Sequence, residues 1–208
     1  PAARPLKTTP VYDRMQAENP LWGDYCGLEH ALWYAPKGAP AEEEVTFRRS
    51  SAHAHVGAEC RAVRDAVGLI EISNYGKFEV TGPDAERWLA TIMANKVPTV
   101  GRVVLTPMLN ERGRLIGDFT MCRIGPERFL LVGTYAAERF YQRWFEARMG
   151  GFDVQVRACA MEWLGFSVAG PASRELLQSL VDEDLSTKAF PFMSFGAMDV
   201  GLVPALVG

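Results

Sequence analysis

The sequence predicts an α+β fold in which helices pack on antiparallel or mixed sheets. The segment Val80–Pro83 is echoed by Val168–Pro171, and an amphipathic helical pattern follows each. Each unit is typical of a strand, a Gly-Pro corner and a core-facing helix. Between them, two apolar runs within Leu105–Phe119 flank a short loop that contains glycine, which predicts a β-hairpin. Because Gly-Pro commonly precedes a helix, the echo alone does not establish a duplication.

Composition sets the class of the protein. Of its 208 residues 48% are hydrophobic and 23% are charged, with a formal net charge of −3. These values suit one large domain, or one domain with an appendage. No basic patch favours nucleic acid as a partner. No apolar run approaches the roughly 20 residues that a membrane-spanning helix needs, and no signal peptide is visible after the first residues.

Residues 1–56 are expected to be irregular and to lack a core of their own, because proline and glycine are frequent there. This segment carries several aromatic residues, namely Tyr12, Trp22, Tyr25, Trp33, Tyr34 and Phe47. Exposed aromatic rings need a surface to lie on. We expect that surface to belong to the domain that follows, at residues 57–208, or to a domain outside this chain.

From His55 onward the pattern becomes regular. The expected helices lie at 59–67 and 135–149, and two more begin at 82–84 and 170–171. In addition to the hairpin, strands are expected at 75–81, 128–132, 154–157 and 163–168. The expected inward positions are Trp88, Leu89, Ile92 and Met93 in the first long helix, Phe140, Trp144 and Phe145 in the second, and Leu176, Leu177, Leu180 and Val181 in the last.

Asp118 is the residue whose chemistry attracts most interest. It lies between Gly117 and Phe119 in an apolar run, and an isolated charge is costly away from water. A carboxylate in such surroundings suits a general base or an electrostatic partner for a cationic intermediate. An outward-facing strand residue, or one paired with Arg114 or Arg123, explains the same pattern. Local chemistry alone leaves both interpretations open.

Other chemical motifs are weak or absent. His53-x-His55 would place two rings on one strand face, but no matching ligand set predicts a metal site. No Walker-type loop or GxGxxG is present. The four cysteines are far apart and form no CxxC pair, so we expect reduced, mostly buried thiols. Such thiols suit a cytoplasmic protein, or a mitochondrial matrix protein in a eukaryote.

Two long motifs resemble a known family. Val67–Ala85 is similar to the opening of the folate-binding domain of the glycine cleavage T-protein, an aminomethyltransferase. Leu109–Asp118, followed by Arg128–Val132, resembles the same domain. The resemblance runs from about His55 to Gly208. It implies a T-protein-like folate-binding domain, which we expect to be truncated because the chain stops in an apolar, strand-like run.

Four further stretches resemble the version of this domain that is fused behind flavin amine oxidases, as in dimethylglycine and sarcosine dehydrogenases or oxidases. These stretches are Pro5–Tyr12, Trp33–Pro36, Val103–Asn110 and Phe190–Ser194. The resemblance implies that residues 1–56 are the tail of a preceding flavin oxidoreductase domain. FAD would then be bound only by a domain or subunit outside this chain.

The resemblance also implies a function. Family members transfer a one-carbon unit from an amine-derived donor to tetrahydrofolate, and Asp118 matches the aspartate that contacts the folate and assists as base or electrostatic anchor. The resemblance further implies that four residues line the folate pocket, namely Tyr75, Leu105, Thr106 and Thr134. The family usually has two acids where this chain has Gly117-Asp118. Its later glutamate segment, which holds the pterin, would follow Gly208.

These departures leave two alternatives open. One is a non-catalytic folate-binding or structural module of the same fold, in which Asp118 is merely solvated or paired. The other is a relative that uses folate for O- or S-demethylation. The fusion-type motifs favour amine demethylation as the first expectation.

Overall fold

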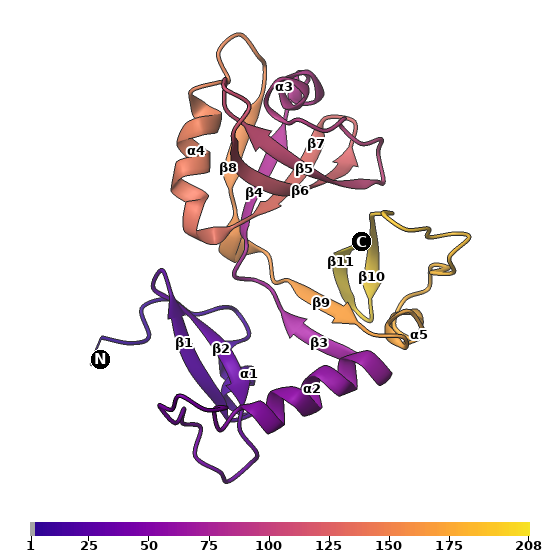
Figure 1. Cartoon of the computed structure of the whole chain (residues 1–208). Coiled ribbons are helices and arrows are strands. Elements are labelled where there is room, and N and C mark those ends of the chain that lie inside the picture. The colour runs from indigo at the N-terminus through magenta and orange to yellow at the C-terminus, as the bar shows by residue number, and fades with distance from the viewer. Residues whose placement is uncertain (1–2) are drawn as a thin grey trace. The chain divides into compact units, whose positions relative to one another are not determined.

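The computed structural model describes residues 3–208 and confirms the predicted α+β class (Figure 1). Helices are interspersed among the strands, and the pairings between the named strands are antiparallel. The described chain divides into two compact units. One contains the residues up to Asn74 together with Met161–Ser173, and the other contains Tyr75–Ala160 and Arg174–Gly208.

The first unit begins with a helix and a hairpin. Helix α1 spans Tyr12–Gln16, and strands β1 (Pro20–Tyr25) and β2 (Leu28–Tyr34) pair around Cys26-Gly27. Both turn residues have positive φ, 54° and 83°, as a tight two-residue hairpin turn requires. The expectation of an irregular segment is therefore wrong for these residues. The assignment of residues 1–56 to a preceding domain stays a prediction.

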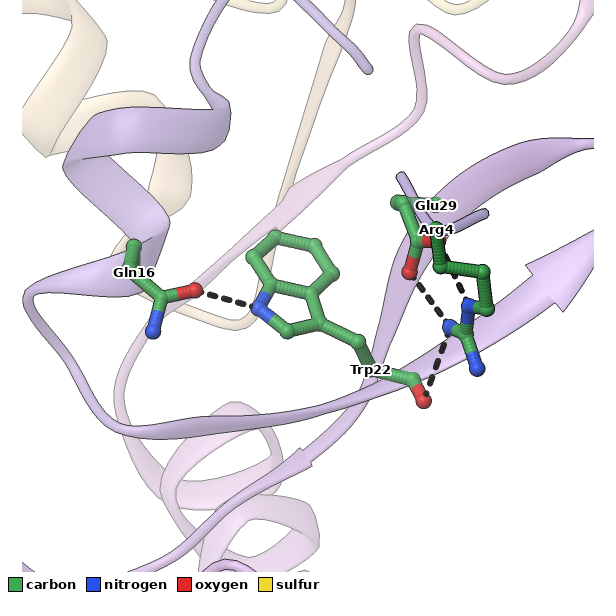
Figure 2. A network of polar contacts seen from close by, with 4 residues as sticks. All are labelled: Arg4, Gln16, Trp22 and Glu29. Carbon is green, nitrogen blue, oxygen red and sulfur yellow. Dashed lines mark hydrogen bonds and ion pairs between the residues drawn. The ribbon is translucent and has the colours of Figure 1, made fainter. Parts of the chain in front are cut away.

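Polar contacts hold the hairpin to the segment before it (Figure 2). The Arg4 guanidinium donates to the Glu29 carboxylate through Nε at 2.7 Å and to the Trp22 carbonyl at 3.3 Å. The Trp22 indole in turn donates to Gln16 Oε1 at 2.6 Å. Trp22 also stacks on Tyr12, with ring centroids 4.4 Å apart, so these two aromatic residues find partners within the segment.

The remainder of the first unit consists of α2 (His53–Asp65) and a two-stranded sheet of β3 (Gly68–Glu71) and β9 (Phe166–Ala169). Helix α2 begins six residues before the expected start. The prediction that His53 and His55 lie on a strand is therefore wrong, because both belong to the first turn of α2.

A five-stranded sheet forms the centre of the second unit, in the order β5-β6-β7-β4-β8. Its strands are β4 (Gly76–Thr81), β5 (Val103–Leu109), β6 (Leu115–Gly125), β7 (Arg128–Gly133) and β8 (Gln155–Ala158). The β5–β6 pair is the hairpin predicted from the sequence. The outer edge of β5 is also occupied, since Val103 N–H donates to the Met193 carbonyl and the Pro107 carbonyl accepts from Ala94 N–H. Such cover prevents edge-to-edge aggregation.

One face of this sheet is covered by α3 (Ala85–Ile92) and α4 (Glu138–Glu146), the latter preceded by a 3₁₀ turn at Tyr135–Ala137. Trp88 and Phe145 are fully buried between the helices and the sheet, with ring centroids 5.7 Å apart. The inward assignment of Phe140 is wrong, because its side chain is 49% exposed. Tyr141, on the next position, enters the core instead.

The C-terminal part of the second unit contains most of α5 (Ser173–Gln178) and a hairpin of β10 (Gly196–Val200) and β11 (Val203–Val207). Its small core is formed by Val181, Leu185 and Met198. Leu176 and Leu180, which were expected to face inward, are exposed. A further 3₁₀ turn lies at Ala160–Glu162. In residues 3–208 no helix is both long and apolar enough to cross a membrane.

Candidate functional site

Strand β6 determines how Asp118 is presented. Successive side chains of a strand point to opposite faces, so Gly117 and Phe119 are buried on the helix-covered face while Asp118 is exposed on the other. Of the two interpretations that the sequence left open, the structure agrees with the outward-facing strand residue. Within the described part of the chain neither expected partner pairs with Asp118: Arg114 forms no ion pair with it, and Arg123 pairs with Glu86 at 2.7 Å. Its carboxyl group is therefore exposed and accessible to a ligand.

The strand register aligns a row of residues with Asp118. Asp118 lies opposite Pro107 in β5, and the β6–β7 pairing of Thr120 with Val132, extended by two residues, places Thr134 on its other side. The β4–β7 pairing of Gly76 with Gly133, extended by one, places Tyr75 beside Thr134. A single cross-strand row therefore contains, in order, Tyr75, Thr134, Asp118 and Pro107, all of them exposed.

A second row runs parallel to the first on the same face. Thr120 pairs with Leu105 on one side and with Val132 on the other, and Val132 pairs with Lys77. The Leu105 side chain is 66% exposed. We use the name open face for the exposed end of this sheet surface, which comprises Tyr75, Leu105, Pro107, Asp118 and Thr134.

Lys77 is a feature of this face to which the sequence analysis gave no role. Its side chain is buried, and its ammonium donates to the carbonyls of Tyr75 at 3.1 Å and Ala160 at 3.2 Å. A buried ammonium is costly unless it is hydrogen-bonded in this way. Lys77 therefore anchors the chain at Tyr75, where the open face begins. A lysine between Gly76 and Phe78 in strand β4 is the sequence feature that could have indicated this contact.

Thr106 is separated from the other predicted folate-pocket residues. It pairs with Phe119 and so points to the helix-covered face, where only 1% of its surface is exposed. Its hydroxyl oxygen accepts a hydrogen bond from the Asn95 backbone N–H at 3.1 Å. The structure thus gathers Tyr75, Leu105 and Thr134 with Asp118 and assigns Thr106 a structural contact. Neighbours in a strand cannot share a face.

Tyr141 is an ionisable group whose pKa responds to burial and to the charge of Asp118. Burial raises the pKa of the Tyr141 phenol, and the negative charge of Asp118 raises that pKa further. The phenol is therefore a neutral group at physiological pH, on the opposite side of β6 from the carboxylate.

The open face suits a flat, nitrogen-rich ring better than a metal ion. Its exposed groups comprise one carboxylate, one hydroxyl, one phenol ring and apolar side chains. A carboxylate accepts hydrogen bonds from ring N–H groups, and aromatic and apolar side chains offer the surface on which a ring can lie. Among residues 3–208 no group of three or more His, Cys, Asp and Glu side chains could hold a metal ion.

Comparison with protein families gives a clear result. Residues 11–208 match the model of the family described as the GCVT N-terminal domain. The chain belongs to this family. The match includes the five-stranded sheet that carries the open face.

Relatives of known name agree with the resemblance seen in the sequence. Mouse mitochondrial dimethylglycine dehydrogenase is 32% identical over 98% of this chain, which covers 24% of that protein. Sarcosine oxidase subunit alpha of Rhizobium meliloti is 33% identical over 92% of this chain, which covers 19% of that protein. The chain thus spans about a quarter or less of the length of the curated relatives that it matches.

A solved structure supports the same fold. The glycine cleavage system aminomethyltransferase T from Bartonella henselae superposes with a TM-score of 0.74 and 25% sequence identity. The alignment covers 92% of this chain and 47% of that chain. The T-protein-like fold expected from the sequence motifs is therefore confirmed, and the chain corresponds to about half of that aminomethyltransferase.

Proposed function

We propose that this chain binds tetrahydrofolate on the open face and takes part in tetrahydrofolate-dependent transfer of a one-carbon unit. The observation that carries this proposal is the row in which Asp118 lies between Pro107 and Thr134, with exposed Tyr75 at the end of the row and exposed Leu105 in the parallel row. It presents one carboxylate among uncharged side chains. Membership of the GCVT N-terminal domain family supports the same assignment.

Four residues of the open face have a direct role in this proposal, and Thr106 has an indirect one. Asp118 would accept hydrogen bonds from N–H groups of the pterin and would stabilise positive charge on an iminium-type donor. The Tyr75 ring and the Leu105 side chain would pack against the pterin, and the Thr134 hydroxyl would complete its hydrogen bonds. Thr106 would act indirectly, by holding Asn95 against β5. When bound, tetrahydrofolate supplies the nucleophilic nitrogen that receives the one-carbon unit.

Exposure of Asp118 determines how large its effect can be. A carboxylate interacts weakly with a cation in bulk water and much more strongly once water is excluded. A flat ligand lying over Tyr75, Leu105 and Asp118 would itself displace that water. The electrostatic contribution of Asp118 is therefore expected to develop on binding.

The names of the relatives indicate the larger reaction. We propose that the one-carbon donor is derived from a methylated amine such as dimethylglycine or sarcosine, because proteins that act on these amines match almost the whole chain. A flavin oxidoreductase domain or subunit, outside this chain, would supply the oxidised donor. In a eukaryote the cellular location would be mitochondrial, as the names of the dimethylglycine dehydrogenases indicate, and in a bacterium we propose a cytoplasmic location.

Calorimetric titration with reduced tetrahydrofolate under anaerobic conditions tests the proposal. The wild-type chain should bind in a saturable manner, and Asp118→Asn should weaken binding at least tenfold, by about 1.5–3 kcal/mol for a lost hydrogen bond to a charged group. Asp199→Asn is the matched control, since Asp199 is an exposed carboxylate on strand β10. Equal affinities of wild type and Asp118→Asn, or weakening of the control to the same degree, would refute a role for Asp118.

A further inference from the structure

The backbone beside Asp118 is held from the helix-covered face by Tyr141 of α4. The Tyr141 ring occupies the place where a side chain of Gly117 would begin. A Cβ at Gly117 would lie 2.6 Å from Tyr141 Cε1 and 2.8 Å from its hydroxyl oxygen. Such contacts are too short to exist, so any side chain at position 117 must displace either the ring or the strand.

The residue on the other side of Asp118 is restrained by the same ring. Tyr141 packs against Phe119 with ring centroids 4.7 Å apart. Phe119 in turn fills the space beside Gly133, where an added Cβ would lie 2.7 Å from Phe119 Cε1. We call these four residues the Tyr141 clamp, namely Gly117, Phe119, Gly133 and Tyr141. Asp118 lies between the two β6 members of the clamp.

We propose that Tyr141 is a positioning residue for Asp118, and that its ring fixes the β6 backbone so that the carboxylate is presented at one place on the open face. The functional consequence rests on the proposed binding of tetrahydrofolate. Tyr141 itself points away from the ligand, into the core. The effect of the clamp is therefore mechanical and passes through the peptide units of residues 117–119.

Packing explains why this clamp can be rigid. The Tyr141 ring is 2% exposed, and its edge meets Phe78 as well as Phe119. Phe145, one turn further along α4, is also fully buried against the sheet. Close-packed cores transmit displacements instead of absorbing them, and a shift of about 1 Å in a functional group can reduce its effect about a hundredfold.

The decisive test enlarges the side chain at position 117 and reduces the side chain at position 141, first singly and then together. Gly117→Ala introduces the forbidden Cβ, and Tyr141→Leu removes the ring. Each single variant of the full chain should weaken tetrahydrofolate binding about tenfold, because each lets Asp118 move. The double variant Gly117→Ala/Tyr141→Leu should bind better than Gly117→Ala alone, because the new methyl group then has space. Coupling of this kind is expected only for residues in contact.

Two further variants separate positioning from general stability. Tyr141→Phe keeps the ring and should keep the wild-type affinity within about twofold. Phe129→Leu is the matched control, because Phe129 is equally buried in the same core but is not part of the clamp. It should lower the melting temperature and leave the affinity unchanged. If Phe129→Leu weakens binding as much as Tyr141→Leu at temperatures where both are folded, the clamp has no specific role.

A second measurement does not depend on folate. In the ligand-free chain, the carboxyl ¹³C signal of Asp118 should shift in Tyr141→Leu and in Gly117→Ala, and it should stay in place in Tyr141→Phe and Phe129→Leu. Failure of the wild type to bind tetrahydrofolate would overturn the proposed function while this signal still decides the clamp. An unshifted Asp118 signal in Tyr141→Leu would overturn the clamp, even if folate binds.

Discussion

The four cysteine thiols are expected to differ sharply in reactivity, because two of them are buried and two are exposed. Cys122 is buried on β6, and burial raises the pKa of its thiol to about 12. The thiolate is the nucleophile, so Cys122 is inert at neutral pH. Cys159 is also buried, whereas Cys26 and Cys60 are exposed, so the expectation of mostly buried thiols holds for two of the four.

Alkylation with iodoacetamide at pH 7.5 should therefore modify Cys26 and Cys60 within minutes and spare Cys122 and Cys159 until the protein is unfolded. Peptide mass spectrometry of the native and the urea-treated protein measures this order. Rapid native labelling of Cys122 would show that the interior of the second unit opens readily.

The ion pair between Arg4 and Glu29 predicts a pH dependence of stability. The Arg4 hydrogen bond lowers the pKa of the Glu29 carboxyl below its ordinary value of 4.5, and the Glu29 side chain is only 3% exposed. A depressed pKa in the folded state stabilises the fold above the unfolded value, and this stabilisation is lost as the pH falls through the folded value. Glu29→Gln should therefore lower the melting temperature at pH 7, and the difference from wild type should shrink as the pH falls through about 4.5 and vanish only below the lowered folded-state pKa.

Glu18→Gln is the control for that measurement. Glu18 pairs with Lys37 at 3.6 Å and both side chains are largely exposed. Exposed pairs contribute about 0–1 kcal/mol, so the melting temperature should change little at either pH. Thermal scans between pH 3 and pH 7 compare the two variants. A pH-independent loss in Glu29→Gln would mean that shape, and not charge, is what Glu29 contributes.

The two Gly-Pro corners are equivalent elements. Gly82, between β4 and α3, has φ of 130°, and Gly170, between β9 and α5, has φ of 124°. In each case an added Cβ would lie 2.4 Å from a backbone carbonyl oxygen, that of Asp153 or Ala66. The echo in the sequence thus corresponds to a shared backbone conformation and close approach, which only glycine allows.

Gly82→Ala should consequently destabilise the protein by more than about 2 kcal/mol, because backbone strain of 1–3 kcal/mol is joined by a clash with the main chain. Gly113→Ala is the matched control, since Gly113 has φ of 71° with nothing within 4 Å of the added Cβ. It should cost only about 1–2 kcal/mol. Urea unfolding of both variants measures the difference, and equal losses would show that the close approach at Gly82 is unimportant.

The inward-facing residues of helix α3 were predicted correctly from the sequence, whereas those of helix α4 were predicted only in part. Trp88 is fully buried, as predicted, and its indole donates to the Arg148 carbonyl at 2.8 Å. Phe140 is half exposed although its spacing from Trp144 suggested a core position. The 3₁₀ turn at Tyr135–Ala137 offsets the start of α4, and Tyr141 and Phe145 become the inward pair.

This difference predicts unequal effects of truncation. Trp88→Ala should cost about 3–5 kcal/mol, as is typical of a large core aromatic residue. Phe140→Ala, the matched aromatic truncation on the other helix, should cost less than about 1 kcal/mol because much of the side chain is already in water. Denaturant titration distinguishes these values. Similar losses for the two variants would contradict the assignment of the α4 face.

At the scale of the whole molecule, much of the architecture follows from the sequence. The alternation of Tyr75–Thr81 and the glycine turn after Asn110 predicted β4 and the β5–β6 hairpin, because both signals are local. The hairpin of β1 and β2 was missed because its turn, Cys26-Gly27, has an unusual first residue. The exposure of Asp118 could not be decided from the sequence, because the face of a strand that meets the core depends on the partners that it acquires.

In the candidate site, too, the sequence alone does not show which side chains lie on the same face of the sheet. Family resemblance nominated Asp118, Tyr75, Leu105, Thr106 and Thr134, but spacing along the chain cannot show which of them share a face. The register of β4, β5, β6 and β7 separates Thr106 from the others. It also reveals how Tyr141 meets Gly117, a contact between residues 24 positions apart that no local pattern encodes.

The most direct test of the central claim asks which face of the five-stranded sheet meets the ligand. Methyl NMR spectra of the labelled chain would be recorded during titration with tetrahydrofolate. The account predicts saturable shifts for Leu105 and Val132, which lie on the face of Asp118, and none for Leu131 and Leu89, which lie under the helices. Shifts confined to the helix-covered face, or no shifts at saturating ligand, would contradict the proposal that folate binds beside Asp118.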